Sequence, residues 1–251
     1  MGKDLLLQAL KHRETDNNPW APFTGISIDK LNGYKAVEVL SDADKFLECI
    51  LAVYKLYAPD GMSIIFDLLM EAEILGCDLK WDGVESPAIL SRPLEKEKII
   101  PCRCMIPTAE SGRIPLVLSA MEKLKKEIGG STALYGPVIG PFALASHLRG
   151  NDINEDISKS PDYFRELVEF CGEVCIKMAD MYINAGMDVI AVVDPLVKQI
   201  SDKHFDDMLT DTFKAIFDFT RSRNALSMTI GGTIPSVGIM LFGGRPQGVS
   251  V

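Results

Sequence analysis

The chain has 251 residues, of which 47% are hydrophobic and 24% are charged, and this length and composition suit one folded domain of barrel size. Its formal net charge of −9 excludes the basic surface of a nucleic-acid-binding protein and disfavours contact with anionic membranes. Residues 1–16 lack the apolar core and the small-residue cleavage site of a secretory signal, so we expect a cytoplasmic protein.

Short apolar runs that end in Gly, Pro or Asp alternate along the chain with amphipathic helical patterns. Ser41 and Asp44 form a capping signature for one of these helices. Continuously apolar strands that alternate with helices predict parallel βαβ units, in a doubly wound sheet or a (β/α)₈ barrel. The expected helices cover 1–15, 42–57, 115–127, the segment between Ser160 and Gly186, and 202–221, and the expected strands cover 61–67, 133–141, 187–195 and 225–232.

Two segments do not fit the alternating pattern. Residues 78–113 are long and irregular, and a loop of that length in a compact domain is usually functional or forms a lid. Residues 225–244 carry no charge and approach the length of a membrane span, but glycines and Pro235 interrupt them. We expect buried strand, turn and short helix there, no membrane partner, and one domain over residues 1–251.

The six cysteines raise the possibility of a metal site or a disulfide. Cys102 and Cys104 are separated by one residue, and Cys171 and Cys175 are four positions apart on an expected helix. Neither spacing is the C-x-x-C of a zinc ribbon, and only three histidines are present to complete a site. We therefore expect buried, reduced thiols that pack as small apolar side chains.

Three side chains follow the ends of predicted strands, where parallel α/β folds gather their reactive residues. Asp67 and Asp194 each close a strand, and His147 lies on an expected helix start just after another. A barrel would bring these ends to one mouth, which makes Asp67, His147 and Asp194 candidate catalytic residues. Helix-capping aspartates and a packed, hydrogen-bonded histidine are the open alternatives.

Two further features are candidates for substrate binding. Arg149 has the chemistry of an anion clamp, although a solvated arginine is the alternative. The turn Gly231-Gly232-Thr233 would let backbone N–H groups approach a carboxylate or phosphate.

Several longer stretches stand out together: GISIDKLNGYKAVEVLSDADKFLECILAVYKLYAPDGMSIIFDLLMEAEILGCDLKWD at 25–82, GPFALASHLRG at 140–150 and AGMDVIAVVDPLVKQISDKHF at 185–205. In this order they resemble the uroporphyrinogen decarboxylase superfamily, and most of all its branch of methylcobalamin:coenzyme M methyltransferases. The resemblance extends over about residues 20–250. It implies a (β/α)₈ TIM-barrel-like fold with the site at the C-terminal mouth.

The resemblance also assigns individual positions. The family's central Asp corresponds to Asp67, and a Tyr of the decarboxylase pocket corresponds to His147. Family decarboxylases hold substrate carboxylates with arginines in a stretch that corresponds to NNPWAPFTGIS at 17–27, which has none. The resemblance therefore disfavours uroporphyrinogen as the substrate.

The methyltransferase branch binds zinc through a His-x-Cys-Gly motif, and zinc there holds a thiol as its thiolate. The motif corresponds to SMTIGGT at 227–233, where Met228 and Ile230 stand at the two ligand positions. We therefore expect no zinc at this motif.

The segment RPQGVSV at 245–251 resembles the family's sixth strand, so the chain is expected to lack about two βα units of the full barrel. Open sheet edges would favour a homo-oligomer or another partner chain. The resemblance implies a corrinoid-linked methyltransferase that moves a methyl group between a methylcorrinoid such as methylcobalamin and a small thiol, with a corrinoid protein as partner. A decarboxylase-like step on a tetrapyrrole is one alternative. A non-catalytic module that binds a corrinoid or tetrapyrrole, or that serves as an oligomeric interaction module, is another.

Overall fold

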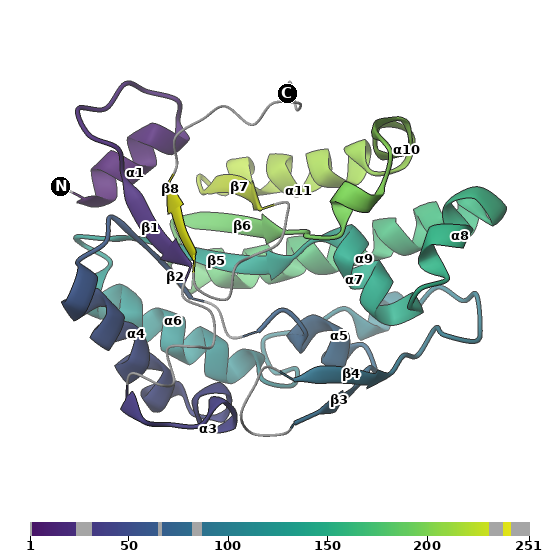
Figure 1. Ribbon diagram of the computed structural model, residues 1–251, viewed down its shortest axis with the longest axis horizontal. Helices are drawn as coiled ribbons and strands as arrows, with labels where there is room; N and C mark the ends of the chain where they lie inside the picture. The colour runs from purple at the N-terminus through teal and green to yellow at the C-terminus, as the bar shows by residue number, and fades with distance from the viewer. Residues whose placement is uncertain (1, 24–31, 65–66, 82–86, 231–237, 242–251) are drawn as a thin grey trace.

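A parallel β-sheet forms the centre of the molecule in the computed structural model, which describes residues 2–23, 32–64, 67–81, 87–230 and 238–241 (Figure 1). All neighbouring pairs in this sheet are parallel, with Tyr135 opposite Val189 and Val189 opposite Leu226. Its strands, in spatial order, are β2 (Gly61–Ser63), β5 (Ala133–Ile139), β6 (Val189–Val193) and β7 (Leu226–Ile230).

Two antiparallel pairs accompany this sheet. β1 (Trp20–Phe23) pairs with β8 (Gly238–Leu241), and β3 (Asp78–Lys80) pairs with β4 (Ala88–Ser91). β1 also lies next to the start of β2, because the Asp60 amide donates to the Trp20 carbonyl at 3.0 Å.

Helices follow the strands, and the arrows of β5 and β6 point toward the end where α8 and α10 lie (right in Figure 1). No helix in the described ranges is long and apolar enough to cross a membrane. The helices are α1 (Gly2–Leu10), α3 (Ala36–Ser41), α4 (Ala43–Tyr57), α5 (Met70–Ile74), α6 (Ile114–Ile128), α7 (Pro141–Arg149), α8 (Ile153–Lys159), α9 (Pro161–Asn184), α10 (Asp202–Met208) and α11 (Thr210–Ser222), with the 3₁₀ turns η2 (Arg103–Met105) and η3 (Val197–Gln199).

β5 and β6 are buried at every position because both faces of the sheet are covered there. In β6, Val189, Ala191 and Val193 face a smaller cluster that includes Leu6 of α1. The alternate side chains Ile190 and Val192 belong to the larger cluster that the helices α4, α6, α7, α9 and α11 build. The two-residue period of a strand thus divides one apolar run between two cores.

The expected α/β class and parallel sheet are confirmed. The described strands do not close into a barrel, because the parallel sheet has four strands and the described segment after β7 pairs antiparallel with β1. Closure over eight strands therefore stays a prediction. Within the irregular segment 78–113 the structure contains the hairpin β3–β4 and the turn η2.

The start of α4 differs from the capping signature read in the sequence. Asp42, not Ser41, is the N-cap residue, and its Oδ1 accepts hydrogen bonds from the Asp44 and Lys45 amides at 2.9 and 3.1 Å. Ser41 ends α3 and its hydroxyl donates to the Val37 carbonyl at 2.6 Å. The helix expected over 202–221 likewise divides in two, with Leu209 between α10 and α11.

Substituting Asp42→Ala should lower the free energy of unfolding by about 1 kcal/mol, because two amides at the start of α4 lose their acceptor. Urea denaturation followed by circular dichroism measures the change. Ser41→Ala is the matched control, with an expected loss below about 0.5 kcal/mol because it removes no cap. Equal losses in the two variants would contradict the assignment of the cap.

Candidate functional site

Asp67 lies just beyond the end of β2 in a buried network of charged side chains. Its Oδ1 accepts from the Leu69 amide at 2.8 Å, and its Oδ2 accepts from Arg113 Nη1 at 2.5 Å. Nε and Nη2 of Arg113 donate to Glu73 Oε2 at 3.0 and 2.9 Å, and the guanidinium lies 5.0 Å from the centre of the Trp81 ring. The Asp67 side chain is only 4% exposed, so this arginine holds the carboxylate in one orientation.

Glu71, in the first turn of α5, is a second carboxyl group in this network. It is 2% exposed, and burial raises its pKa from 4.5 to about 7. The negative charge of Asp67 also raises the pKa, whereas Arg113 and backbone hydrogen bonds lower it. Sequence reasoning missed Glu71. The available signal was an acidic residue four positions after the strand-end Asp67, directly after the apolar run Leu68-Leu69-Met70.

Asp194, at the end of β6, is fully buried against the N-terminus of α7. Its Oδ2 accepts from the Phe142 amide at 2.9 Å, and its Oδ1 accepts from the Ala143 amide at 3.1 Å. Burial raises its pKa to about 7 despite these hydrogen bonds. Gly140 allows this contact, because a Cβ at that position would collide with the Asp194 side chain. The carboxyl group therefore caps α7 and ties it to β6, whereas the alternative read from the sequence was a cap on the helix that follows Asp194.

His147 lies in the last turn of α7, not at the helix start that the sequence suggested. The helix begins earlier, at Pro141, because proline fits the first helical position. Burial and the nearby positive charge of Arg92 lower the pKa of His147 to about 4, so the ring is neutral at pH 7. Its Nδ1 is buried and has no hydrogen-bond partner among the described residues. The backbone carbonyl of His147 accepts from the Cys77 thiol at 3.5 Å.

Arg149 is 5% exposed, and its Nε and Nη1 donate hydrogen bonds to protein groups. Nε donates to Asp156 Oδ2 at 2.7 Å, and Nη1 donates to the carbonyls of Leu94 and Glu95 at 2.8 and 2.9 Å. In this arrangement Arg149 joins the segment of Leu94 and Glu95 to Asp156 of α8. Substrate binding by Arg149 stays a prediction, and Gly231, Gly232 and Thr233 lie outside the described residues.

The three strand-end candidates Asp67, His147 and Asp194 thus have separate sets of contacts. Among the described residues, no hydrogen bond or ion pair joins any two of Asp67, His147 and Asp194. Asp67 is instead grouped with Glu71 and Arg113, which the sequence analysis did not name as candidates.

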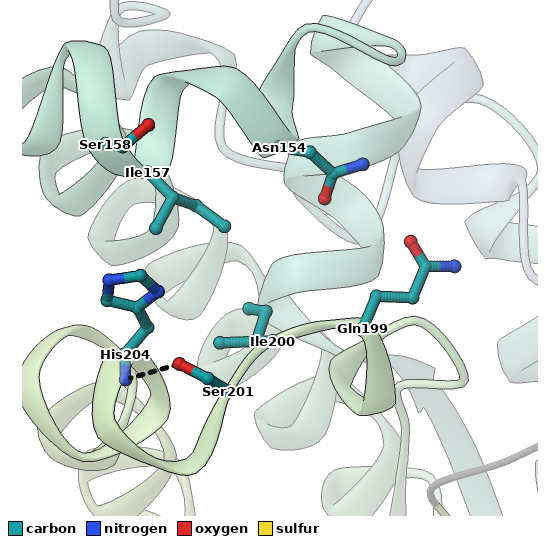
Figure 2. Close-up of a pocket in the computed structure, with 7 residues that line it drawn as sticks. All are labelled: Asn154, Ile157, Ser158, Gln199, Ile200, Ser201 and His204. Carbon is teal, nitrogen blue, oxygen red and sulfur yellow. Dashed lines mark hydrogen bonds between the residues drawn. The ribbon is translucent and has the colours of Figure 1, made fainter.

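A surface hollow of about 420 Å³ lies at the end of the sheet where β5 and β6 finish (Figure 2). One wall belongs to α8 and the other to η3 and the start of α10, so the segments that follow the two strands face each other. The side chains of Asn154 and Gln199 point toward the opening between these walls, and the His204 ring lies near Ile157 (Figure 2). The hollow is lined by Asn154, Ile157, Ser158, Gln199, Ile200, Ser201 and His204.

The sequence pattern of the uroporphyrinogen decarboxylase (URO-D) family matches residues 1–245. The chain belongs to this family.

Relatives of this URO-D family member include several named enzymes. It is 26% identical over 197 residues to methylcobamide:CoM methyltransferase MtbA of Methanosarcina mazei, a match that covers 77% of this chain and 58% of the relative. It is 26% identical over 230 residues to methylcobamide:CoM methyltransferase MtaA of Methanosarcina barkeri, covering 88% of this chain and 64% of the relative. It is 25% identical over 194 residues to a uroporphyrinogen decarboxylase of Wolbachia pipientis, covering 76% and 55%. The chain thus spans 58–64% of the length of the two methyltransferases.

Among solved structures, a methyltransferase from Methanosarcina mazei superposes with a TM-score of 0.80. The match covers 92% of this chain and 70% of the other at 23% sequence identity, and it supports the fold of the URO-D family member.

Met228 and Ile230, which the resemblance assigns to the zinc-ligand positions of the methyltransferase branch, lie on β7. Ile230 is buried and Met228 packs against the same apolar cluster, on the face of the sheet that α1 covers. A hydrocarbon side chain and a thioether do not supply the imidazole and thiolate that zinc prefers. Within the described part of the chain, no three His, Cys, Asp or Glu side chains are grouped to hold a metal ion. These residues do not fit the family's zinc site.

The cysteines divide into two classes. Cys49, Cys77, Cys171 and Cys175 are buried, as expected. The expectation was wrong for Cys102 and Cys104, which are exposed, because they lie on the turn η2 within the irregular segment 78–113 and not in a helix or strand of the core.

Proposed function

We propose that this URO-D family member transfers a methyl group from a methylated corrinoid to a small thiol. The observation that carries the proposal is the buried group of Asp67, Glu71 and Arg113 at the end of β2. Parallel α/β folds gather their reactive side chains at the ends of strands. Strongly shifted carboxyl pKa values are typical of functional sites. The likeness to methylcobamide:CoM methyltransferases supports the choice of substrates.

The reaction needs a proton acceptor. The carbon–cobalt bond breaks as the thiol sulfur bonds to the methyl carbon, and the thiol proton must leave. Because the thiolate is the better nucleophile, removal of this proton promotes the transfer. Glu71, with a pKa of about 7, is ionised in part of the molecules at neutral pH and can take up a proton there. Arg113 holds the neighbouring Asp67 carboxylate in place, and this carboxylate accepts a hydrogen bond from the thiol. The corrinoid is a substrate in this scheme, supplied free or on a corrinoid protein, and no step passes through zinc.

The test is the absorption spectrum of methylcobalamin incubated with the purified protein and 2-mercaptoethanesulfonate, with and without added zinc. Loss of the methyl–cobalt band faster than in a protein-free control supports methyl transfer. A strict zinc requirement would contradict the zinc-free scheme and point to ligands other than Met228 and Ile230. An unchanged spectrum would reject transfer to this thiol.

Asp67→Asn should slow the transfer by about 100-fold, because a neutral amide pairs less well with Arg113 and accepts a hydrogen bond from the thiol less strongly than the carboxylate does. The initial rate of loss of the methyl–cobalt band measures this effect. Arg113 keeps Glu73 as a partner, so the variant should retain its far-ultraviolet circular dichroism. Asp211→Asn, an exposed aspartate on α11, is the matched control and should keep the full rate. An unchanged rate in Asp67→Asn would remove this residue from the mechanism.

A second candidate is a binding module that takes up a corrinoid or tetrapyrrole without turning it over. The apolar side chains of Met228 and Ile230 at the positions of the family's metal ligands favour it. Saturable quenching of the protein's tryptophan fluorescence by methylcobalamin, with no loss of the methyl–cobalt band, would support this function over methyl transfer.

A further inference from the structure

Cys102 and Cys104 share one side of a short turn on the molecular surface. Cys102 is the N-cap residue of η2, and its sulfur accepts a hydrogen bond from the Cys104 amide at 3.3 Å. The Met105 amide closes the turn by donating to the Cys102 carbonyl at 2.8 Å. Both thiols are exposed, in contrast to the four buried cysteines of the core.

The residue between the two cysteines anchors this turn to the body of the protein. Nε of Arg103 donates to both carboxylate oxygens of Glu173 at 3.0 and 2.8 Å, and Nη2 donates to Oε1 at 2.8 Å. Glu173 belongs to α9, the long helix that packs against the sheet. The forked geometry holds the backbone of the turn, and therefore the spacing of the two thiols, in one arrangement.

The two thiols are not equivalent. Hydrogen bonds from the Cys104 side chain and then from its amide lower the pKa of Cys102, because they stabilise the thiolate. The hydrogen bond to Cys102 is also the main cause that raises the pKa of Cys104. Cys102 is thus the thiol that more readily becomes the nucleophilic thiolate, and Cys104 is the resolving thiol.

We propose that Cys102 and Cys104 form a dithiol site that exchanges with small-molecule disulfides. The Cys102 thiolate attacks one sulfur of the disulfide, a new S–S bond forms, the old one breaks, and a small thiolate leaves. Cys104 gives its proton to the solvent and attacks the Cys102 sulfur, which expels the second small thiolate. The protein dithiol loses two electrons and becomes a Cys102–Cys104 disulfide, while the small disulfide gains them and becomes two thiols. An accessible thiolate next to a resolving cysteine is the arrangement that favours this exchange. The activity does not depend on methyl transfer.

The experiment treats the full-length, reduced protein with oxidised glutathione and follows the intact mass over time. The wild-type protein should lose the mass of two hydrogens and retain no glutathione, because Cys104 resolves the mixed disulfide. Cys104→Ser should instead accumulate a stable glutathione adduct on Cys102. Cys102→Ser should form an adduct at least about tenfold more slowly, because the remaining thiol lacks the hydrogen bonds that stabilise a thiolate.

Control variants test whether the exchange is specific to Cys102 and Cys104. Serine is close to cysteine in size and both positions are exposed, so these variants should keep the circular dichroism of the wild type. Cys171→Ser, which alters a buried thiol, should leave the exchange unchanged. A persistent adduct on the wild-type protein, or equal rates in Cys102→Ser and Cys104→Ser, would overturn the proposal. Because Asp67→Asn does not alter this turn, it should exchange at the wild-type rate, which separates this activity from the proposed methyl transfer.

Discussion

Replacing Arg149 with methionine is expected to lower the free energy of unfolding by about 3 kcal/mol. The arginine is 5% exposed and its partner Asp156 has a side chain that is 2% exposed. Removing one member of such a pair leaves the other charge buried. Lys98, 2.7 Å from the other Asp156 oxygen, still neutralises part of that charge and keeps the loss near the lower end of the usual range. The carbonyls of Leu94 and Glu95 also lose their donor.

Urea denaturation monitored by fluorescence measures this loss, and Arg165→Met is the matched control. Arg165 lies 3.6 Å from Asp162, and both side chains are exposed to solvent. Replacing Arg165 should lower the free energy of unfolding by less than about 0.5 kcal/mol. A loss below about 1 kcal/mol for Arg149→Met would show that the attachment of the Leu94–Glu95 segment to α8 contributes little to stability. Methyl transfer at normal rate by a folded Arg149→Met variant would in turn reject a role of this residue in substrate binding.

The strands of the fold were predictable because both of their faces are apolar. A sheet that is covered on both sides has no polar face, and the runs at β5 and β6 show this directly in the sequence. The start of α4 was harder to predict. Asp42 and Ser41 are adjacent residues that both cap well, and only the backbone path decides which of them meets the free amides.

The candidate site was predictable only in part, because strand ends identify positions but not partners. The sequence singled out Asp67 and Asp194. It could not show that the Asp194 carboxylate turns back to cap α7, since that contact joins residues about fifty positions apart. Arg113 was read as part of an irregular segment, yet it reaches Asp67 across 46 positions of the chain. Glu71 was missed because a charged side chain on a short helix normally faces solvent.

Glu71→Gln is expected to be more stable than the wild-type protein at pH 8, although it changes a buried residue. Burial raises the pKa of Glu71 from 4.5 to about 7, so the folded protein favours the neutral carboxyl group. The stability that this preference contributes is fully present below pH 4.5 and is lost as the pH rises to about 7. Glutamine is neutral throughout. The stability of the variant relative to the wild type should therefore rise between these pH values, by up to about 3 kcal/mol, and stay constant above them.

Urea denaturation of both proteins between pH 4 and pH 8.5 measures this difference, and the subtraction cancels the contributions of Asp194 and His147. Glu155→Gln is the matched control of opposite sign. A hydrogen bond from Lys159 lowers the pKa of this exposed glutamate, so the stability of that variant relative to the wild type should fall or stay level as the pH rises. A constant difference for Glu71→Gln would mean that Glu71 is not desolvated in the folded protein. A rising difference would show that the Glu71 carboxyl group lowers the stability of the protein at neutral pH and that an amide at the same position does not. Such a cost is expected of a group that takes up a proton during a reaction, and a slower methyl transfer by the more stable variant would connect the two.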